Sequence, residues 1–199
     1  DATVMNAFNS DGFTVVSHAI SNASSATYVA WNWLAGTAFS NDASATGVGD
    51  IDSAGQINAK AGFSIISYTG TGSTTTFGHG LGVQPEILFF KNRDASRGWL
   101  VLTKVLQTKY LSLEGTGAEQ PGYYTGSNTF DDRMTSSIIT VDGSTTEVNT
   151  SGEKYICYAF HSVEGYSKVG SYIGNGSTDG TFVHTGFRPA WIMQKKSNN

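Results

Sequence analysis

The fold of this chain depends on one apolar stretch of its sequence, Lys154-Tyr155-Ile156-Cys157-Tyr158-Ala159-Phe160. Successive side chains of a β-strand point to opposite faces of the sheet, and here both alternating sets are apolar. A strand that is apolar on both faces is covered on both faces. We therefore expect residues 154–160 to form a central strand with packed side chains above and below it.

Short runs of β-branched and aromatic residues, separated by Gly, Ser, Thr, Asn and Asp, continue in both directions from this stretch. No run has a sustained 3.6-residue apolar period with capping residues, so we expect less than about a tenth of the chain to be helical. Many short strands with turn residues between them predict an all-β fold, an antiparallel β-sandwich of the jelly-roll or lectin-like kind. Strands are expected near residues 13–17, 27–33, 63–68, 85–91, 98–103, 108–113, 136–141, 154–160, 166–172 and 189–194.

The sequence also contains an internal repeat. Thr27-Tyr28-Val29-Ala30-Trp31-Asn32-Trp33 matches residues 154–160 position by position in size and aromaticity. A second block, over residues 62–85, has the order Gly-aromatic-Ser, Tyr, Gly-x-Gly-Ser, Phe, His and Pro, and this order returns over residues 165–189. Both copies of the second block continue into an apolar run that ends in lysine. Two blocks that recur in the same order predict tandem β units.

The order of the repeated blocks predicts the domain organisation. Residues 62–160 form one complete unit, residues 1–33 supply the closing strands of a preceding unit, and residues 165–199 supply the opening strands of a following unit. Residues 34–61 are mostly Ala, Ser, Gly, Asn and Asp, and this composition predicts a linker with little contact to the core.

Each half-unit would leave apolar strand faces and backbone edges uncovered. Three solutions are open: the halves pair with each other, they pair between copies of the chain, or they are completed by sequence beyond these residues. We favour the second and third solutions, because the complete unit lies between the two halves in the sequence. Within the strands, we expect four aromatic residues to be core anchors, namely Tyr28, Trp31, Tyr155 and Tyr158.

The repeated blocks resemble a domain of tail-fibre-like and other virion structural proteins of marine tailed bacteriophages. The motifs that carry the resemblance are Thr27–Trp33, Gly62–Gly70, His79–Pro85, Val163–Lys168, Gly174–Ser177 and Thr185–Trp191. The resemblance implies a virion component built from tandem β modules, and it assigns no catalytic residue. We expect a non-enzymatic structural protein on the particle exterior, in a fibre, a spike or a surface decoration, with a role in host attachment. Its partners would be other copies of itself or other virion proteins.

Composition excludes several other classes of protein. Charged residues make up 14% of the 199 residues and the net charge is -4, whereas a nucleic-acid-binding surface needs clustered Lys and Arg. No apolar run approaches the roughly 18 residues of a membrane helix, so membrane insertion is not expected. The single cysteine, Cys157, cannot form an internal disulfide, and we expect it to be a buried, inert thiol.

Glycine and histidine motifs are better explained by structure than by chemistry. Gly-x-Gly occurs at residues 70–72 and 174–176, but without the third glycine and the following helix of a dinucleotide-binding loop, so turns are expected. His79 and His184 occupy equivalent places before a Gly/Pro bend and have no neighbouring cluster of metal ligands. We expect such a histidine to bond a carbonyl and fix the loop, and we predict no metal site and no cofactor.

The densest acidic positions are Asp131-Asp132-Arg133, Asp42, Asp50 and Asp52. They lie in polar stretches, where turn-forming or solvated carboxylates are expected, whereas glycoside hydrolysis needs a carboxyl pair with one raised pKa. The sequence therefore predicts no catalytic residue and no enzyme. A secreted glycan hydrolase is disfavoured for the same reason.

The remaining candidates are aromatic side chains. Trp31, Trp33, Trp99 and Trp191 lie inside expected strands and are read as core. Tyr123 and Tyr124, beside Pro121-Gly122, are the best candidates for an exposed ligand-binding pair. They support the alternative function, a lectin-like carbohydrate-binding module that recognises host surface glycans.

Overall fold

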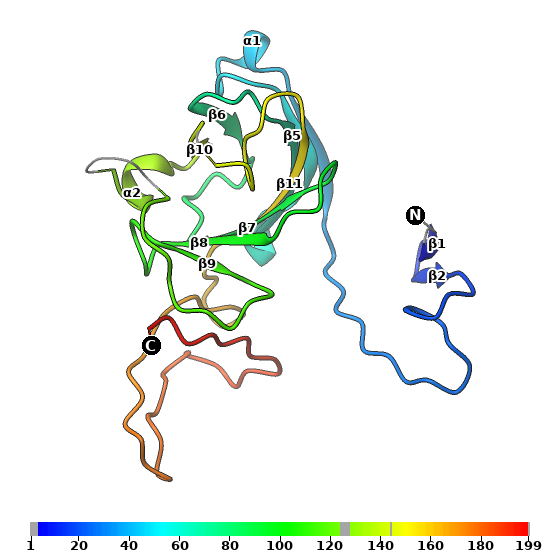
Figure 1. Cartoon of the computed structure of the whole chain (residues 1–199), viewed down its shortest axis with the longest axis vertical. Coiled ribbons are helices and arrows are strands. Elements are labelled where there is room, and N and C mark those ends of the chain that lie inside the picture. Colours follow the sequence, from blue (N-terminus) through cyan, green and yellow to red (C-terminus); the bar gives the residue numbers. More distant parts are fainter. Residues whose placement is uncertain (1–3, 124–127, 144, 199) are drawn as a thin grey trace. The chain divides into compact units, whose positions relative to one another are not determined.

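The computed structural model of the protein describes residues 4–123, 128–143 and 145–198 (Figure 1). Contacts divide the chain into two compact units, Asp1–Leu34 and Ala35–Asn199. In the first unit, β1 (Met5–Phe8) and β2 (Phe13–Val15) form an antiparallel two-stranded sheet. The strand expected near residues 13–17 is thus present. No helix in the described part of the chain is long and apolar enough to span a membrane.

The second unit contains a seven-stranded antiparallel sheet with the strand order β3-β4-β5-β11-β7-β8-β9. Its strands are β3 (Thr37–Asn41), β4 (Ser53–Asn58), β5 (Phe63–Thr69), β7 (Ile87–Asn92), β8 (Trp99–Thr103), β9 (Tyr110–Ser112) and β11 (Lys154–Phe160). A second sheet pairs β6 (Thr75–Gly78) with β10 (Ile138–Val141). The described helices are α1 (Ala43–Thr46), α2 (Phe130–Arg133) and the 3-10 turn η1 (Ala59–Ala61). The predicted all-β class with few helical residues is confirmed.

The position of β11 confirms the prediction made from its apolar faces. It is hydrogen-bonded to β5 on one side and to β7 on the other, with Tyr155 opposite Tyr68 and Asn92. Tyr155, Cys157 and Ala159 are fully buried on one face of this strand. Tyr158 and Phe160 are partly buried on the other face, against the cluster around Phe89. Of the expected core anchors, Tyr155 is therefore a core residue, and Tyr158 packs on the edge of the smaller cluster.

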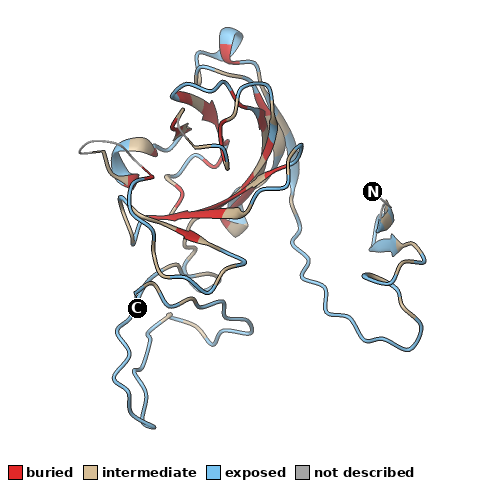
Figure 2. Cartoon of the chain, viewed as in Figure 1, coloured by how far each residue is buried: buried red, intermediate tan, exposed pale blue. Residues whose placement is uncertain are grey.

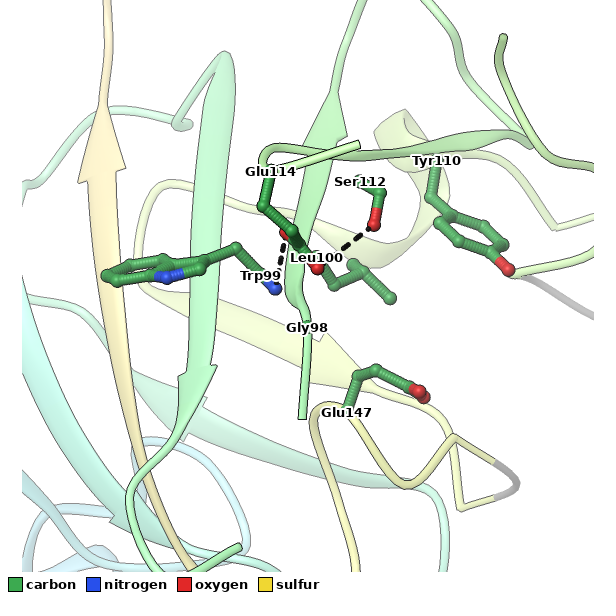
Figure 3. A pocket seen from close by; sticks show the side chains of 7 residues that line it. All are labelled: Gly98, Trp99, Leu100, Tyr110, Ser112, Glu114 and Glu147. Atoms are coloured by element: carbon green, nitrogen blue, oxygen red, sulfur yellow. Dashed lines mark hydrogen bonds between the residues drawn. The ribbon is translucent and has the colours of Figure 1, made fainter. Parts of the chain in front are cut away.

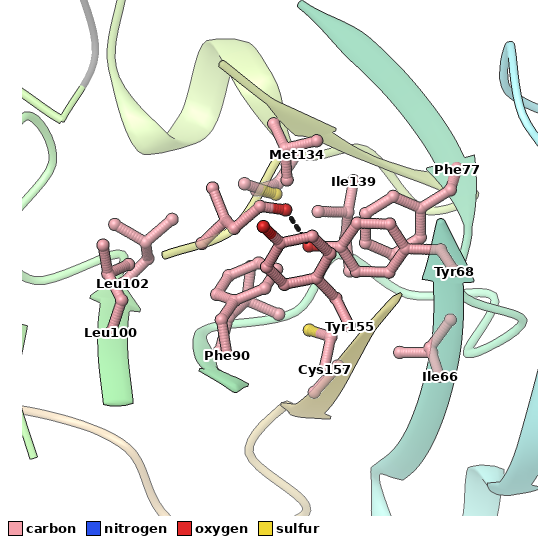
Figure 4. Close-up of a cluster of buried hydrophobic side chains, with 14 of the residues drawn as sticks. Ile66, Tyr68, Phe77, Phe90, Leu100, Leu102, Met134, Ile139, Tyr155 and Cys157 are labelled. Carbon is pink, nitrogen blue, oxygen red and sulfur yellow. Dashed lines mark hydrogen bonds between the residues drawn. The ribbon is translucent and has the colours of Figure 1, made fainter. Parts of the chain in front are cut away.

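The main core lies between the two sheets (Figures 2 and 4). Phe77 of β6 and Ile139 of β10 pack against side chains from the seven-stranded sheet. The rings of Tyr68 and Phe77 are stacked at 4.1 Å between centroids, which joins the sheets directly. The buried Ser64 hydroxyl also donates to the His79 carbonyl at 2.8 Å. This two-layer packing is that of a β-sandwich.

The prediction of a linker over residues 34–61 is wrong. β3 and β4 extend the sheet from β5, and the register from Ser53 opposite Tyr68 to Asn58 opposite Phe63 is continuous. The small residues of this segment are needed for that approach, because a Cβ built on Gly55 would lie 1.8 Å from the Ile65 carbonyl oxygen. These strands are stabilised by pairing with β5, and their poor apolar content hid that interaction in the sequence.

Three of the expected strands are absent from the described residues. Residues 27–33, 166–172 and 189–194 are described throughout, and apart from an isolated bridge between Val163 and Ser167 they pair with no strand. Tyr28 and Trp31 are 44% and 65% exposed, so the prediction that they anchor a core of the single chain is wrong. A strand needs neighbouring strands for its hydrogen bonds and its packing, and here those neighbours are missing.

Candidate functional site

A cavity of about 260 Å³ opens beside the β8–β9 edge of the large sheet (Figure 3). It is lined by polar, aromatic and apolar residues from β8, β9 and three loops, namely Gly98, Trp99, Leu100, Tyr110, Ser112, Glu114 and Glu147. This cavity gathers two carboxyl groups, a phenol and a hydroxyl.

Strand alternation explains which side chains of β9 reach the cavity. Tyr110 and Ser112 are two residues apart and share one face of the strand, whereas Leu111 between them packs into the cluster on the opposite face. Leu100 of β8 lies directly opposite Ser112. Glu147 comes from the connection between β10 and β11 and lies across the cavity from β9 (Figure 3).

The Glu114 carboxylate is held in place at the end of β9. Its Oε2 accepts from the Trp99 backbone N–H at 3.0 Å, and its Oε1 accepts from the Ser112 hydroxyl at 3.4 Å. Burial acts to raise the pKa of Glu114, but backbone and Ser112 hydrogen bonds and the nearby charge of Lys91 outweigh it and lower the pKa. Glu114 is therefore a fixed, ionised hydrogen-bond acceptor at neutral pH.

Trp99 lines the cavity mainly through its backbone. Figure 3 shows its indole pointing away from the other labelled side chains. The ring lies 6.0 Å from that of Tyr158, and the Lys91 ammonium is 5.8 Å from its centroid. Trp99 therefore belongs to the outer face of the sheet, as its reading as a structural residue predicts.

These groups suit a small, neutral, hydroxyl-bearing ligand. Carboxylate oxygens accept from hydroxyl groups, and the tyrosine ring offers an apolar face of the kind that packs against a sugar ring. The volume is below the roughly 300–1,000 Å³ of typical ligand pockets, so it would hold one sugar unit at most. Among the described residues, no group of three or more His, Cys, Asp or Glu side chains is placed to hold a metal ion.

A second hollow, of about 310 Å³, is lined by small and polar residues between β3, β6 and the loop before β10. Asn41, its largest polar side chain, donates to the Val48 carbonyl at 2.8 Å and accepts from the Thr46 hydroxyl at 2.7 Å. These bonds hold the α1 turn in place, and we assign the hollow a structural role.

One member of the predicted ligand-binding pair, Tyr123, is not exposed. Tyr123 is 1% exposed and belongs to the main core, so the prediction that it is an exposed ligand contact is wrong. Its neighbours Pro121 and Gly122 suggested an exposed loop. The side chain of Tyr123 instead packs among the buried apolar residues of the main core. Tyr124 lies outside the described residues.

His79 has the role that the sequence predicted for it. Its Nδ1 accepts from the Leu81 backbone N–H at 3.2 Å, so in the neutral ring Nε2 carries the proton and donates to the Thr135 carbonyl at 3.2 Å. The ring thereby ties the loop after β6 to the segment before β10. Burial lowers the pKa of His79 to about 4. The equivalent His184 lies among exposed residues, 6.5 Å from the ring of Phe182.

The glycine motif and the cysteine also match their structural interpretations. Gly70 and Gly72 donate to the carbonyls of Glu153 and Asn149 at 2.9 Å each, which makes the 70–72 turn part of the packed domain. Cys157 is fully buried, and burial raises the pKa of its thiol well above the ordinary value. A buried thiol of this kind is unreactive.

The acidic positions fix turns and helix ends. Asp132 forms a capping box with Thr129 at the start of α2, and Asp131 pairs with Lys104 at 3.5 Å. Asp42 caps α1, while Asp50 accepts from the backbone and hydroxyl of Thr76. Asp52 likewise accepts from the backbone N–H of Ala43 at 2.9 Å.

The residues that do line the cavity were not selected from the sequence. Ser112-x-Glu114 at a strand end was the one local signal, since it places a carboxylate beside the start of the partner strand. Glu147 gave none, because its position depends on the course of the β10–β11 connection. The distance along the chain between β9 and this connection hides their proximity.

Comparison with known proteins gives a family. No curated protein matches the chain, and no solved structure matches it. Residues 1–199 match the family described as "Domain of unknown function (DUF7483)". The match covers the β-sandwich and the segments on both sides of it in the sequence. The chain therefore belongs to the DUF7483 family.

Proposed function

We propose that this chain is a non-enzymatic structural component of a phage particle, exposed on the particle as part of a fibre, a spike or a surface decoration. The observation that carries the proposal is the contrast between a well-packed β-sandwich and the apolar segments on either side of it. Val29, Ile173 and Phe182 are 76%, 88% and 84% exposed. Segments that expose several large apolar side chains are typical of surfaces that become buried on assembly.

Three further observations support a passive role. The chain has few charged residues and its sequence resembles marine phage virion proteins. In addition, the lowered pKa of Glu114 makes that group a poor proton donor, whereas glycoside hydrolysis requires a carboxylic acid with a raised pKa. Partners would be other copies of the chain or other virion proteins.

Immunogold electron microscopy of particles from the phage that encodes this chain tests the location. Antibodies raised against residues 35–160 should label intact purified particles on their exterior. Absence of the chain from purified particles, or labelling only after disruption, would contradict the proposal. Antibodies against the major capsid protein serve as the positive control for particle integrity.

A second candidate function, binding of a host surface glycan during attachment, is favoured by the cavity beside β9. Tyr110, Ser112, Glu114 and Glu147 offer an aromatic ring and several hydrogen-bond acceptors around one space. Glycan-array binding that is lost in Glu147→Gln and Tyr110→Ala, and kept in the exposed-surface control Glu164→Gln, would support it. An array without a specific signal, or a signal that all three variants retain, would exclude this cavity as the glycan site.

A further inference from the structure

β11 shows how the facing edges of two strands, β5 and β7, are joined by a central strand in this fold. It runs from Lys154 opposite Thr69 to Phe160 opposite Phe63, and on its other side from Tyr155 opposite Asn92 to Phe160 opposite Ile87. One seven-residue strand thus completes two ladders, between β5 and β7. Without it, the two neighbours would have no hydrogen-bonding partner on their inner edges.

Residues 27–33, the donor segment, have the pattern of β11. Tyr28, Ala30 and Asn32 correspond to the fully buried Tyr155, Cys157 and Ala159, and the alternate positions hold Val29, Trp31 and Trp33. The segment has no charged residue and no proline, so every backbone group is available to a ladder. Tyr28, Val29 and Trp31 are 44%, 76% and 65% exposed in the single chain.

The repeat also identifies where a strand of this pattern fits. Residues 166–172 correspond to β5 and residues 189–195 to the β7 region, and we call these two ranges the acceptor segments. Within them Tyr172, Ile192 and Met193 are 51%, 69% and 48% exposed. The Tyr172 hydroxyl donates to Gln194 Oε1 at 3.0 Å, so the acceptor segments lie beside each other.

We propose that the donor segment of one copy inserts as the central strand between the acceptor segments of a second copy. The proposal rests on the structural function proposed above, because each chain carries one donor and one pair of acceptors. Copies joined in this way form a reciprocal pair or a ring where the rotation closes, and a head-to-tail line, the geometry of a fibre, where it does not. The repeat fixes the register: Asn32, like Ala159 opposite Leu88, comes to lie opposite Ile192.

This register gives a direct test by disulfide trapping. Two differently tagged single variants, Asn32→Cys and Ile192→Cys, both in a Cys157→Ala background, are mixed and oxidised. The covalent heterodimer should form at least about tenfold more readily than with the out-of-register control Val29→Cys mixed with Ile192→Cys, since a disulfide forms only within a narrow distance range. Mass spectrometry identifies the linked residues.

The double variant Asn32→Cys/Ile192→Cys separates the two ways of pairing. Linked oligomers support donation between copies. A disulfide-closed monomer, with no heterodimer from the mixed single variants, would overturn it in favour of pairing within one chain. No disulfide between these positions in any sample would overturn donation altogether. The location of the chain in the particle is measured separately, so failure here and failure of the proposed function are distinguishable.

Light scattering on the unmodified chain provides an independent measurement. Its mass should rise with concentration, and Trp31→Glu should remain a monomer because a charge would enter the buried centre of the new sheet. Because Trp31 is exposed in the single chain, Trp31→Glu should leave the β-sandwich intact, and thermal melting of this variant checks that it does. A concentration-independent monomer for both proteins would contradict the proposal.

Discussion

β5, β7 and β11 lie side by side in one sheet, whereas the acceptor and donor segments, which repeat their sequences, form no strand in the single chain. Tyr155 is fully buried and its counterpart Tyr28 is 44% exposed. The ring of His79 is enclosed between two loops, and His184 lies in an exposed segment. The same residue pattern thus has two outcomes in one molecule.

This difference shows that the alternating apolar pattern favours a β-strand, and that the presence of neighbouring strands decides whether one forms. β11 is a strand because β5 and β7 supply both of its ladders and the β6–β10 sheet covers one of its faces. The donor segment has the same alternation but forms no strand. β-propensity depends on this context more than helix propensity does.

Limited proteolysis with trypsin should show the largest difference between the two regions. In the Trp31→Glu variant, cleavage after Lys168 should be at least about a thousandfold faster than after Lys91, because cleavage within β7 requires unfolding of the whole sheet. Time-resolved mass spectrometry measures the order of cuts. Similar rates at Lys91 and Lys168 would show that the acceptor segments are as well packed as β7.

Truncation of the two matched tyrosines should differ in the free energy of unfolding. Tyr155→Ala removes a buried ring whose hydroxyl donates to the Thr146 carbonyl at 2.9 Å, so we expect a loss of about 3–5 kcal/mol. Tyr28→Ala should lower the stability of the monomer by less than about 1 kcal/mol. Urea unfolding of both variants, measured at monomeric concentrations, checks this, and equal losses would contradict the contrast.

Acid should destabilise the β-sandwich through His79. Burial lowers its pKa from 6.5 to about 4, so between these pH values the unfolded chain binds a proton that the folded chain does not. Above pH 6.5 His79 therefore takes nothing from the free energy of unfolding. As the pH drops from 6.5 to 4, the free energy of unfolding falls by about 3 kcal/mol in all. Urea titrations across this range should show that slope in the wild type and in His184→Asn. A slope that persists in His79→Asn would assign the effect to another group.

The smallest expected effect is in residues 34–61, the segment that was predicted to be a linker from its composition. Gly55→Ala should destabilise the domain by about 1–3 kcal/mol, because the new methyl group would collide with the Ile65 carbonyl of β5. Gly117→Ala is the matched control: nothing lies within 4 Å of its Cβ, and a change within about 0.5 kcal/mol is expected. Equal, small changes would mean that β4 does not pack closely against β5.

The sequence was sufficient to predict the β class, the central strand and the role of His79, because each depends on a strong local pattern. Apolar residues on both faces of residues 154–160 indicate burial wherever the partners come from. β3 and β4 were missed because Gly55 and its small neighbours contribute backbone pairing and little apolar surface. The cavity beside β9 was missed because Glu114 and Glu147 come together only through the tertiary fold.

β11 is the last of the seven strands of its sheet in sequence order, yet it occupies the middle of that sheet. Until residues 154–160 have left the ribosome, β3-β4-β5 and β7-β8-β9 are two separate three-stranded pieces whose inner edges, at Ile66 and Phe90, have no partner. The sheet therefore closes only after nearly the whole domain has been made, and by contacts between residues far apart in sequence. Such a topology folds slowly for its size, and during synthesis it exposes strand edges that favour association with neighbouring nascent chains.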